Sequence, residues 1–238
     1  MGWNYQYTYE TMPACEEQAD GMRVIAGDTS AYRANLIPED VVYAAKDGKA
    51  LHLKMIYPER LDEEKPYPLY VHIQGSAWQK QNLFNHVEDF QAVVRAGYIV
   101  AIVEYRPTPD AIFPSQVEDA KDAIRYLAAH AKELGIDTSR IFVSGDSSGG
   151  HTCLLCWATW ESGKLDAHPE QPLPEVRAFV DCYGVVDLEA LSAPGVVHGV
   201  KNDPATSPET MLLGGLIPSE HPEEARKVSV LSYITEQT

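Results

Sequence analysis

The stretch that decides the fold is Gly145-Asp146-Ser147-Ser148-Gly149-Gly150-His151. It follows a short apolar run, Ile141–Ser144, and precedes an apolar helical pattern that reaches about Trp160. Its first five residues fit G-x-S-x-G, which in a strand–turn–helix context is typical of a nucleophile elbow. Such a tight turn needs nearly side-chain-free neighbours, and the helix N-terminus offers free N–H groups and a positive dipole end to a developing oxyanion. The pattern predicts Ser147 as a nucleophile.

Two other interpretations of this stretch are weaker. A glycine-rich turn between strand and helix can also bind phosphate. The sequence Gly-Asp-Ser-Gly-Gly marks chymotrypsin-like proteases, but Ser148 is an extra residue here. Those proteases are all-β and place His and Asp before the Ser, so the helical patterns around Ser147 exclude their fold.

A second candidate site element is His72-Ile73-Gln74-Gly75-Ser76-Ala77-Trp78, at the end of another apolar strand. Small residues allow backbone N–H groups to approach a substrate closely, and a loop at this position commonly completes an oxyanion hole. We therefore expect donors from the backbone of Ser76 or Ala77, with Gly75 in the same loop, joined by the N–H of Ser148. The Trp78 side chain is expected to line the substrate site on the side of the acyl group or of the leaving group. A plain tight turn is the alternative.

The rest of the chain alternates strands and helices. A hairpin is predicted for Val41–Ala45 and Leu51–Tyr57, with one wet face that includes His52 and Lys54. Short, mostly apolar runs then predict strands buried on both faces, and amphipathic stripes predict helices between them. The strands are Leu69–Gln74, Tyr98–Tyr105, Ile141–Ser144 and Val176–Tyr183; the helices cover residues 87–94, 117–131 and 147–160. This order predicts an α/β-hydrolase fold, a mostly parallel doubly wound sheet with antiparallel N-terminal strands.

The predicted domain organisation is simple. Residues 1–39 are expected to form an N-terminal arm, and residues 40–238 a single α/β-hydrolase domain. Within that domain, residues 161–175 should form a surface loop, and residues 185–230 are rich in Pro and Gly and would suit a cap over the site.

The net charge of −16 argues against nucleic acid and anionic membranes as partners. No apolar run approaches the roughly 20 residues of a membrane span, and the N-terminal residues do not resemble a secretory signal. Cys153 and Cys156 form a C-x-x-C in an apolar helical run, which favours buried helix residues over a zinc or redox site. Free thiols fit a reducing compartment, so a cytoplasmic location is expected.

Several motifs occur here in the order found in one group of bacterial esterases. Besides the nucleophile elbow they are Gln74–Trp78, Val103-Glu104-Tyr105-Arg106, Phe113-Pro114 and Tyr183-Gly184-Val185-Val186-Asp187-Leu188. Over roughly residues 38–238 the chain resembles the feruloyl and acetyl xylan esterase-like α/β-hydrolases, relatives of the hormone-sensitive lipase group. The resemblance implies hydrolysis of small acyl esters, including acetylated or feruloylated xylo-oligosaccharides. Gln74 stands where many relatives have His, and its side chain is expected to hold the loop by hydrogen bonds.

A serine triad in this fold runs in the order Ser, Asp, His, with both partners after the strand Val176–Tyr183. We expect the chain to lack them, together with the last two strands, and therefore to be inactive alone. Val176–Tyr183 would then be an exposed sheet edge, and the chain marginal and prone to aggregate. His151 is expected to pack against its neighbours and not to act as the base. An in-chain triad is a less favoured alternative, and its candidate members are His198, His221, Asp181, Asp187 and Asp203.

The predicted function is hydrolysis of carboxylic esters through an acyl-enzyme on Ser147. The expected partner is a small-molecule ester, with no metal or organic cofactor, and homo-oligomerisation stays open. One alternative is an amidase of the arylformamidase kind, which shares the fold and the nucleophile. Another is a non-catalytic binding protein on a hydrolase scaffold, although such a protein has no use for a strained elbow.

Overall fold

A computed structural model describes residues 21, 34–36, 40–58, 65–191 and 204–236. The chain divides into two units, Met1–Ala31 and Tyr32–Thr238, and all that follows concerns the second. The predicted arm, 1–39, lies almost wholly outside the described residues.

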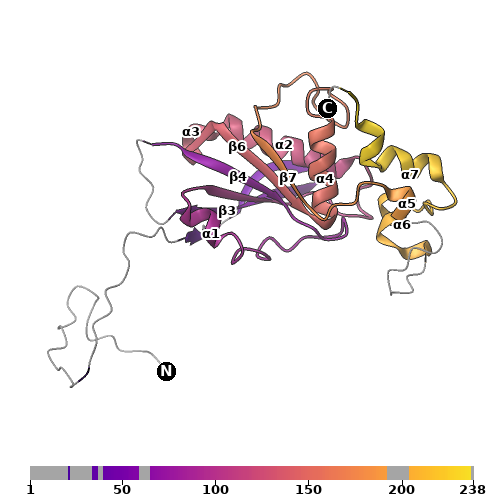
Figure 1. The fold of residues 1–238 in the computed structure, drawn as a ribbon, viewed down its shortest axis with the longest axis horizontal. Coiled ribbons are helices and arrows are strands. Elements are labelled where there is room, and N and C mark those ends of the chain that lie inside the picture. The colour runs from indigo at the N-terminus through magenta and orange to yellow at the C-terminus, as the bar shows by residue number, and fades with distance from the viewer. Residues whose placement is uncertain (1–20, 22–33, 37–39, 59–64, 192–203, 237–238) are drawn as a thin grey trace. The chain divides into compact units, whose positions relative to one another are not determined.

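The core of the second unit is a single mixed sheet (Figure 1). Its strands, as far as the structure describes the chain, have the order β1-β3-β5-β4-β6-β7, and β2 pairs with β3. They are β1 (Ala34–Leu36), β2 (Val41–Lys46), β3 (Lys49–Pro58), β4 (Tyr67–Ile73), β5 (Ile99–Val103), β6 (Ile136–Asp146) and β7 (Ala178–Cys182).

The sheet is antiparallel at its start and parallel afterwards. β3 is antiparallel to β1, β2 and β5, whereas the pairs β4–β5, β4–β6 and β6–β7 are parallel. Asp47 and Gly48, both with positive φ, turn the chain from β2 into β3, as the hairpin prediction requires. This is the predicted α/β-hydrolase arrangement.

Helices cover both faces of the sheet (Figure 1). α2 (Ser115–Ala129) and α4 (Ser147–Ala158) bury their apolar residues on one face, and α1 (Gln91–Arg95) packs on the other. The short α3 (Ala131–Leu134) ends at Gly135, whose φ of 69° allows the left-handed cap. Cys153 and Cys156 are fully buried on α4, as predicted, and burial raises the pKa of the Cys156 thiol to about 12.

Three expectations about these elements were wrong. Lys54 is not on a wet face: its side chain is buried under the Phe84 ring and forms an ion pair with Asp40. The predicted helix over 87–94 is only the five-residue α1, preceded by turns. β7 is not buried on both faces: Val180 on this strand is 40% exposed, because in the described part of the chain β7 pairs with β6 alone.

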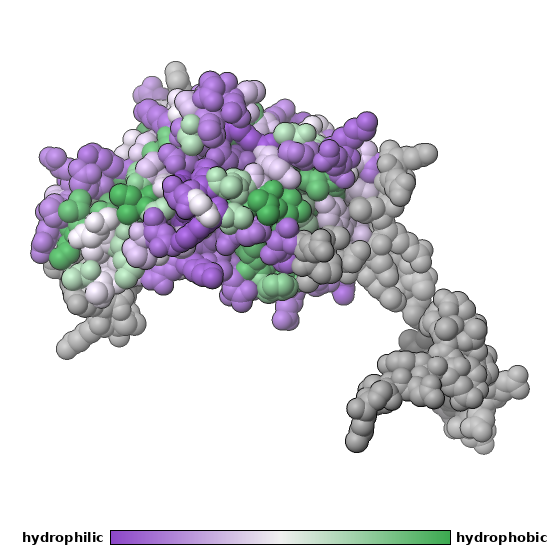
Figure 2. Space-filling view, turned by 180° about the vertical axis from the view of Figure 1, so that it is seen from behind, coloured by the Kyte–Doolittle hydropathy of each residue, from purple (hydrophilic) through white to green (hydrophobic). Residues whose placement is uncertain are grey.

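The predicted cap forms a separate cluster at one end of the sheet (Figure 1). Its helices are α5 (Leu188–Leu191), α6 (Pro208–Leu212) and α7 (Pro222–Val228). No helix in the described ranges is long and apolar enough to cross a membrane. The face shown in Figure 2 is largely hydrophilic, in keeping with the net charge of −16.

Candidate active site

Ser147 lies in a strained turn between β6 and α4. Its φ is +50°, in the left-handed region that residues with side chains rarely adopt. A Cβ atom at Gly145 would lie less than 3.0 Å from the Gly149 carbonyl, and one at Gly149 less than 3.0 Å from the Ile73 carbonyl. Side chains at either glycine would therefore push this turn off the sheet, which is the physical reason for the motif.

The nucleophile stands at the N-terminus of a helix. Ser147 is the first residue of α4 and is half-buried, so its hydroxyl stands where the first helical N–H groups have no partner in the helix. The Ser148 N–H is one of these groups, and the positive end of the helix dipole acts at the same place. This arrangement favours negative charge next to Ser147 Oγ.

The residues on either side of Ser147 hold the loop formed by residues 75–78. The Gly75 N–H donates to Asp146 Oδ1 over 2.7 Å, and the Ser76 N–H donates to Ser148 Oγ over 2.9 Å. Both amides are therefore engaged. The Ala77 N–H has no hydrogen-bond partner among the described residues, and Ala77 has a φ of +53°. Together with the Ser148 N–H, it stays available to an oxyanion.

Tyr105 supports the same loop from below. Its hydroxyl donates to the Gln74 carbonyl over 3.0 Å and lies 2.9 Å from Ser76 Oγ. The ring is completely buried, and burial raises the pKa of its phenol. Gln74 does not hold the loop through its side chain as expected, since its Oε1 is buried without a partner in the described part of the chain. Tyr105 holds it instead, through the Gln74 backbone.

Asp146 is ionised in this setting. Partial burial raises the pKa of its carboxyl, but the nearby His72 ring and the Gly75 N–H outweigh that and bring the pKa below the ordinary value. His72 Nε2 lies 3.2 Å from Asp146 Oδ1, outside hydrogen-bond geometry, and His72 Nδ1 lies 3.0 Å from Ser144 Oγ. The negative carboxylate is thus fixed one residue before the nucleophile, where it orders the loop.

Trp78 and His151 join the site to the cap. The Trp78 indole donates to His151 Nδ1 over 3.1 Å, and the opposite ring nitrogen, Nε2, lies 2.8 Å from the Val228 carbonyl. Trp78 is only 2% exposed and packs against Leu188, Leu212 and Val228. Its position gives it a packing role, and the substrate contact expected of it stays a prediction.

None of the described histidines reaches Ser147. His151 is buried in the pair with Trp78, and burial lowers its pKa to about 4, so it packs as expected. His72 lies beneath Asp146, and His52 binds Glu104. Among the residues that the structure describes, no hydrogen bond is made to the Ser147 hydroxyl.

The acids considered as triad members also have structural partners. Asp187 accepts the Ala190 N–H at the start of α5, and Asp181 accepts the Gly184 N–H after β7. His221 is the residue before α7. His198 and Asp203 lie outside the described residues.

The sequence pointed to Ser147 and the 75–78 loop but missed what connects them. Neither the Asp146 carboxylate nor the Ser148 hydroxyl was expected to bind that loop, and Tyr105 was noted only for the resemblance. A signal was available: Asp146 and Tyr105 are polar residues directly after or at the end of apolar strands, where parallel strands bring side chains to one sheet edge.

The sheet order, the elbow and the facing loop define an α/β-hydrolase of the esterase type. The BD-FAE family model matches residues 54–238, more than three quarters of the chain. The chain therefore belongs to the BD-FAE family.

Named relatives agree with this class. A probable carboxylic ester hydrolase, LipM of Mycobacterium tuberculosis, is 29% identical over 67% of this chain and 37% of its own length. The ethyl acetate hydrolase of Pseudomonas putida is 29% identical over 75% of this chain and 56% of its own. A truncated carbohydrate esterase from gut microbiota has a TM-score of 0.68 at 27% identity, over 87% of this chain and 74% of that one. The chain spans about half or less of these two curated relatives.

Proposed function

We propose that this site hydrolyses carboxylic esters through an acyl-enzyme on Ser147. The observation that carries the proposal is the strained Ser147 at the start of α4, facing the 75–78 loop with the Ala77 and Ser148 amides free to bind an oxyanion. Ser147 Oγ would attack the ester carbonyl and lose its proton to a base. The C–O bond to the alcohol then breaks, and water hydrolyses the acyl group from Ser147.

The chain by itself is proposed to be a slow catalyst. A serine hydroxyl is a weak nucleophile without a neighbouring general base, and His151, His72 and His52 are engaged with other groups. Loss of the base from a serine hydrolase removes about 10⁴–10⁶ of the rate, although oxyanion stabilisation leaves some activity.

Small acyl esters are the proposed substrates, and acetylated or feruloylated xylo-oligosaccharides are candidates among them. The family match and the structural likeness to a carbohydrate esterase support this choice. The name of the ethyl acetate hydrolase supports a small acyl group. A cytoplasmic location stays a prediction: it fits the unpaired, buried Cys153 and Cys156.

The test is hydrolysis of p-nitrophenyl acetate by purified 1–238 beside its Ser147→Ala variant. We expect the two to be equally slow, within about twofold, because no base is bonded to Ser147 among the residues that the structure describes. Rapid turnover that needs Ser147 would contradict the slow-catalyst proposal and support the esterase site. His198→Ala would then identify whether that residue, outside the described part, supplies the base.

An arylformamidase-like amidase is the alternative from the same fold. Comparing phenyl acetate with formanilide on the protein that shows Ser147-dependent turnover separates the two. A larger kcat/KM for formanilide would replace the esterase with the amidase. Reversible ester binding by this chain, with no covalent adduct at Ser147, would support the third reading, a non-catalytic binding protein on a hydrolase scaffold.

A further inference from the structure

A serine, a histidine and an aspartate lie in a row beside the nucleophile turn. His72 of β4 places its Nδ1 3.0 Å from Ser144 Oγ and its Nε2 3.2 Å from Asp146 Oδ1. The ring packs on Phe90, with centroids 4.7 Å apart, on the α1 side of the sheet. Ser144 is only 1% exposed, so its hydroxyl is closed to a substrate and the row is not a second catalytic triad. Its effect must come through Asp146.

The contacts of the Ser144 hydroxyl limit where the His72 ring carries its hydrogen. Ser144 Oγ lies 3.0 Å from His72 Nδ1 and also 3.3 Å from the Val71 carbonyl, and it has one hydrogen to donate. If that hydrogen goes to Nδ1, the neutral ring has its own hydrogen on Nε2. If it goes to Val71, Nδ1 must donate to Ser144, and Nε2 is then either bare or protonated as part of an imidazolium.

A bare Nε2 is the unfavourable member of this set. The atom is buried without a hydrogen-bond partner among the described residues, and the Asp146 carboxylate lies next to it. A lone pair that faces a negative oxygen is repelled, and burial removes the water that would screen the repulsion. A hydrogen on Nε2 makes the same contact attractive, even away from the ideal line of a hydrogen bond.

Asp146 transmits this contact to the 75–78 loop. Its Oδ1 accepts the Gly75 N–H over 2.7 Å and, as a carboxylate oxygen, has a second acceptor site for His72. Burial raises the pKa of the Asp146 carboxyl, but His72 and then the Gly75 N–H lower it by more. The same two groups that keep Asp146 ionised therefore join β4 to the loop.

We propose that His72 carries a hydrogen on Nε2 and that this hydrogen holds the Asp146 carboxylate against the 75–78 loop, which makes His72 a positioning residue for the esterase site. This role rests on the proposed function, because the loop position matters to catalysis only if the loop amides bind an oxyanion. The ring itself touches no substrate. It acts through Asp146 on the Gly75 amide, and so on the position of the loop relative to Ser147.

The other polar groups around the ring are more distant or less direct. The His86 ring, from the segment before α1, lies 6.0 Å from that of His72 between centroids and pairs with Asp89 over 2.8 Å. The Tyr183 hydroxyl lies 3.4 Å from the other oxygen of Asp146. Within the described ranges, Asp146 is the carboxylate that comes within 4 Å of a His72 ring nitrogen.

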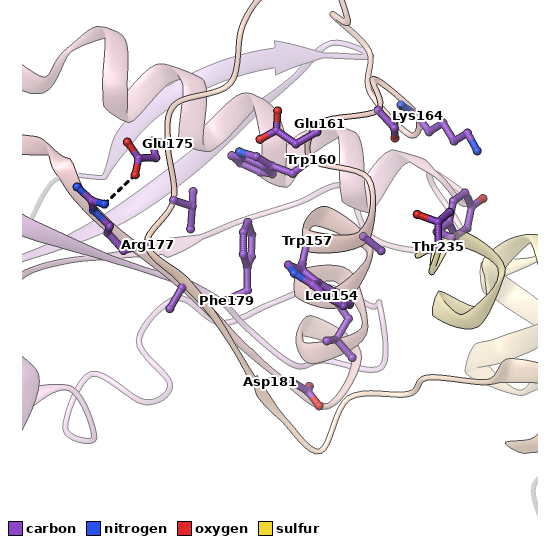
Figure 3. Close-up of a pocket in the computed structure, with 15 residues that line it drawn as sticks. Leu154, Trp157, Trp160, Glu161, Lys164, Glu175, Arg177, Phe179, Asp181 and Thr235 are labelled. Carbon is purple, nitrogen blue, oxygen red and sulfur yellow. Dashed lines mark hydrogen bonds and ion pairs between the residues drawn. The ribbon is translucent and has the colours of Figure 1, made fainter. Parts of the chain in front are cut away.

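A groove beside β7 lies apart from this row (Figure 3). It has a volume of about 730 Å³ and lies between β7, α4 and the loop after α4, and neither Ser147 nor the 75–78 loop lines it. Leu154 and Trp157 of α4 face Phe179 across it, on the α4 side of the sheet. His72 is on the α1 side, so the Trp157 indole can serve as an internal reference when His72 is changed.

The first measurement is the nitrogen NMR spectrum of the His72 ring in unmutated 1–238, assigned by its loss in His72→Gln. The chemical shift of Nε2 and its coupling to the ring hydrogens should show a bound hydrogen at neutral pH. A ring with its hydrogen on Nδ1 and a bare Nε2 would overturn the proposal. This result is read on the unmutated chain, so it decides the question even if a variant fails to fold.

The second measurement compares His72→Phe with His72→Gln. Phenylalanine keeps a ring against Phe90 but offers no N–H, whereas glutamine can donate an amide N–H to Asp146. His72→Phe should raise the pKa of Asp146 and speed amide exchange at Gly75 roughly two- to threefold, with the Trp157 indole unchanged. His72→Gln should bring both quantities back toward those of the unmutated chain.

His86→Gln is the matched control, because it removes a histidine from the same pocket that does not contact Asp146 directly. It should leave exchange at Gly75 unchanged and raise the pKa of Asp146 less than His72→Phe does, since His86 has the smaller effect on that carboxyl. A control that matches His72→Phe in both quantities would overturn the proposal.

Recovery in His72→Gln supports the proposal. Unchanged values in His72→Phe overturn it, and so does equal disturbance by both variants, because the shape of the ring and not its hydrogen would then matter. None of these measurements reads turnover. Absence of ester hydrolysis would leave the His72 contact in place, and a bare Nε2 would leave Ser147-dependent hydrolysis in place.

Discussion

The two neighbours of Ser147 do more than frame the nucleophile. Asp146 and Ser148 each accept one amide of the 75–78 loop, at Gly75 and Ser76 respectively. The nucleophile turn thus holds the 75–78 loop in place. The position of Ser147 and the position of the loop amides that would bind the oxyanion are therefore fixed together. Such preorganisation lets donors stabilise charge without moving during the reaction.

Amide exchange tests this pair of hydrogen bonds. Asp146→Ala should speed hydrogen exchange at the Gly75 amide by about two- to tenfold, the equivalent of one hydrogen bond, and affect Ser76 less. Ser148→Ala should do the reverse. The measurement is amide exchange by NMR at fixed pH. Equal effects of both variants at both amides would show that the loop loosens as a unit and that the separate bonds do not control it.

Gly149 is the residue with the least tolerance in the elbow. A methyl group there meets the Ile73 backbone, which cannot move aside without breaking β4. Gly149→Ala should lower the free energy of unfolding by about 3 kcal/mol or more, at the upper end of overpacking effects.

Urea unfolding measures this difference, with Gly163→Ala as the control. Gly163, unlike Gly149, has a positive φ, of 66°, and its added Cβ would make only an ordinary contact with Pro169. That variant should lose about 1–2 kcal/mol from backbone strain alone. A loss at Gly149 no larger than at Gly163 would contradict the steric account of the motif.

Between elements, the decisive contact is the chain from Trp78 through His151 to Val228. An indole N–H can only donate, so His151 Nδ1 must accept it and Nε2 must carry the proton that the Val228 carbonyl receives. The neutral ring therefore ties the 75–78 loop and α4 to α7. A second proton would set an N–H against the indole N–H in a fully buried place.

This contact makes stability depend on pH. Burial lowers the folded pKa of His151 to about 4, whereas the unfolded chain takes up its proton near pH 6.5. The free energy of unfolding should fall as pH drops from about 6.5 to 4, by about 3 kcal/mol from this group, and not change further below that.

Urea unfolding at several pH values checks this, beside His151→Gln. Glutamine can accept from Trp78 and donate to Val228 but takes up no proton. The variant should lose most of this dependence between pH 4 and 6.5. The same slope in both proteins would assign the effect to other groups.

Sequence patterns predicted the strands and helices better than they predicted the burial of individual side chains. The mostly parallel sheet, the hairpin of β2 and β3 and the helix after Ser147 follow from local signals and were confirmed. The burial of Lys54 and Trp78 was not predictable, since it depends on Phe84 and on the cap helices, which are distant in sequence. β1 was missed because three residues carry too little periodicity.

At the scale of the domain, the sheet places the candidate active site and the groove beside β7 at different locations. The ends of β4 and β6 present the elbow and its loop, and the flank of β7 presents the groove. The sequence predicted that Val176–Tyr183 would be an exposed sheet edge, and among the described residues β7 (Ala178–Cys182) pairs with β6 alone.

The central claim is that the start of α4 stabilises negative charge at position 147, whichever residue supplies the base. The direct test is Ser147→Cys in a background of Cys15→Ser and Cys182→Ser, since a thiol ionises without a base and Cys153 and Cys156 are buried. The measurements are the pKa of the introduced thiol and its reaction with p-nitrophenyl acetate. We predict a pKa below about 8.5, one equivalent of p-nitrophenol and one acetyl group at position 147. A pKa at or above that value, with reactivity no greater than that of the exposed Cys182 in the unmutated chain, would contradict the account.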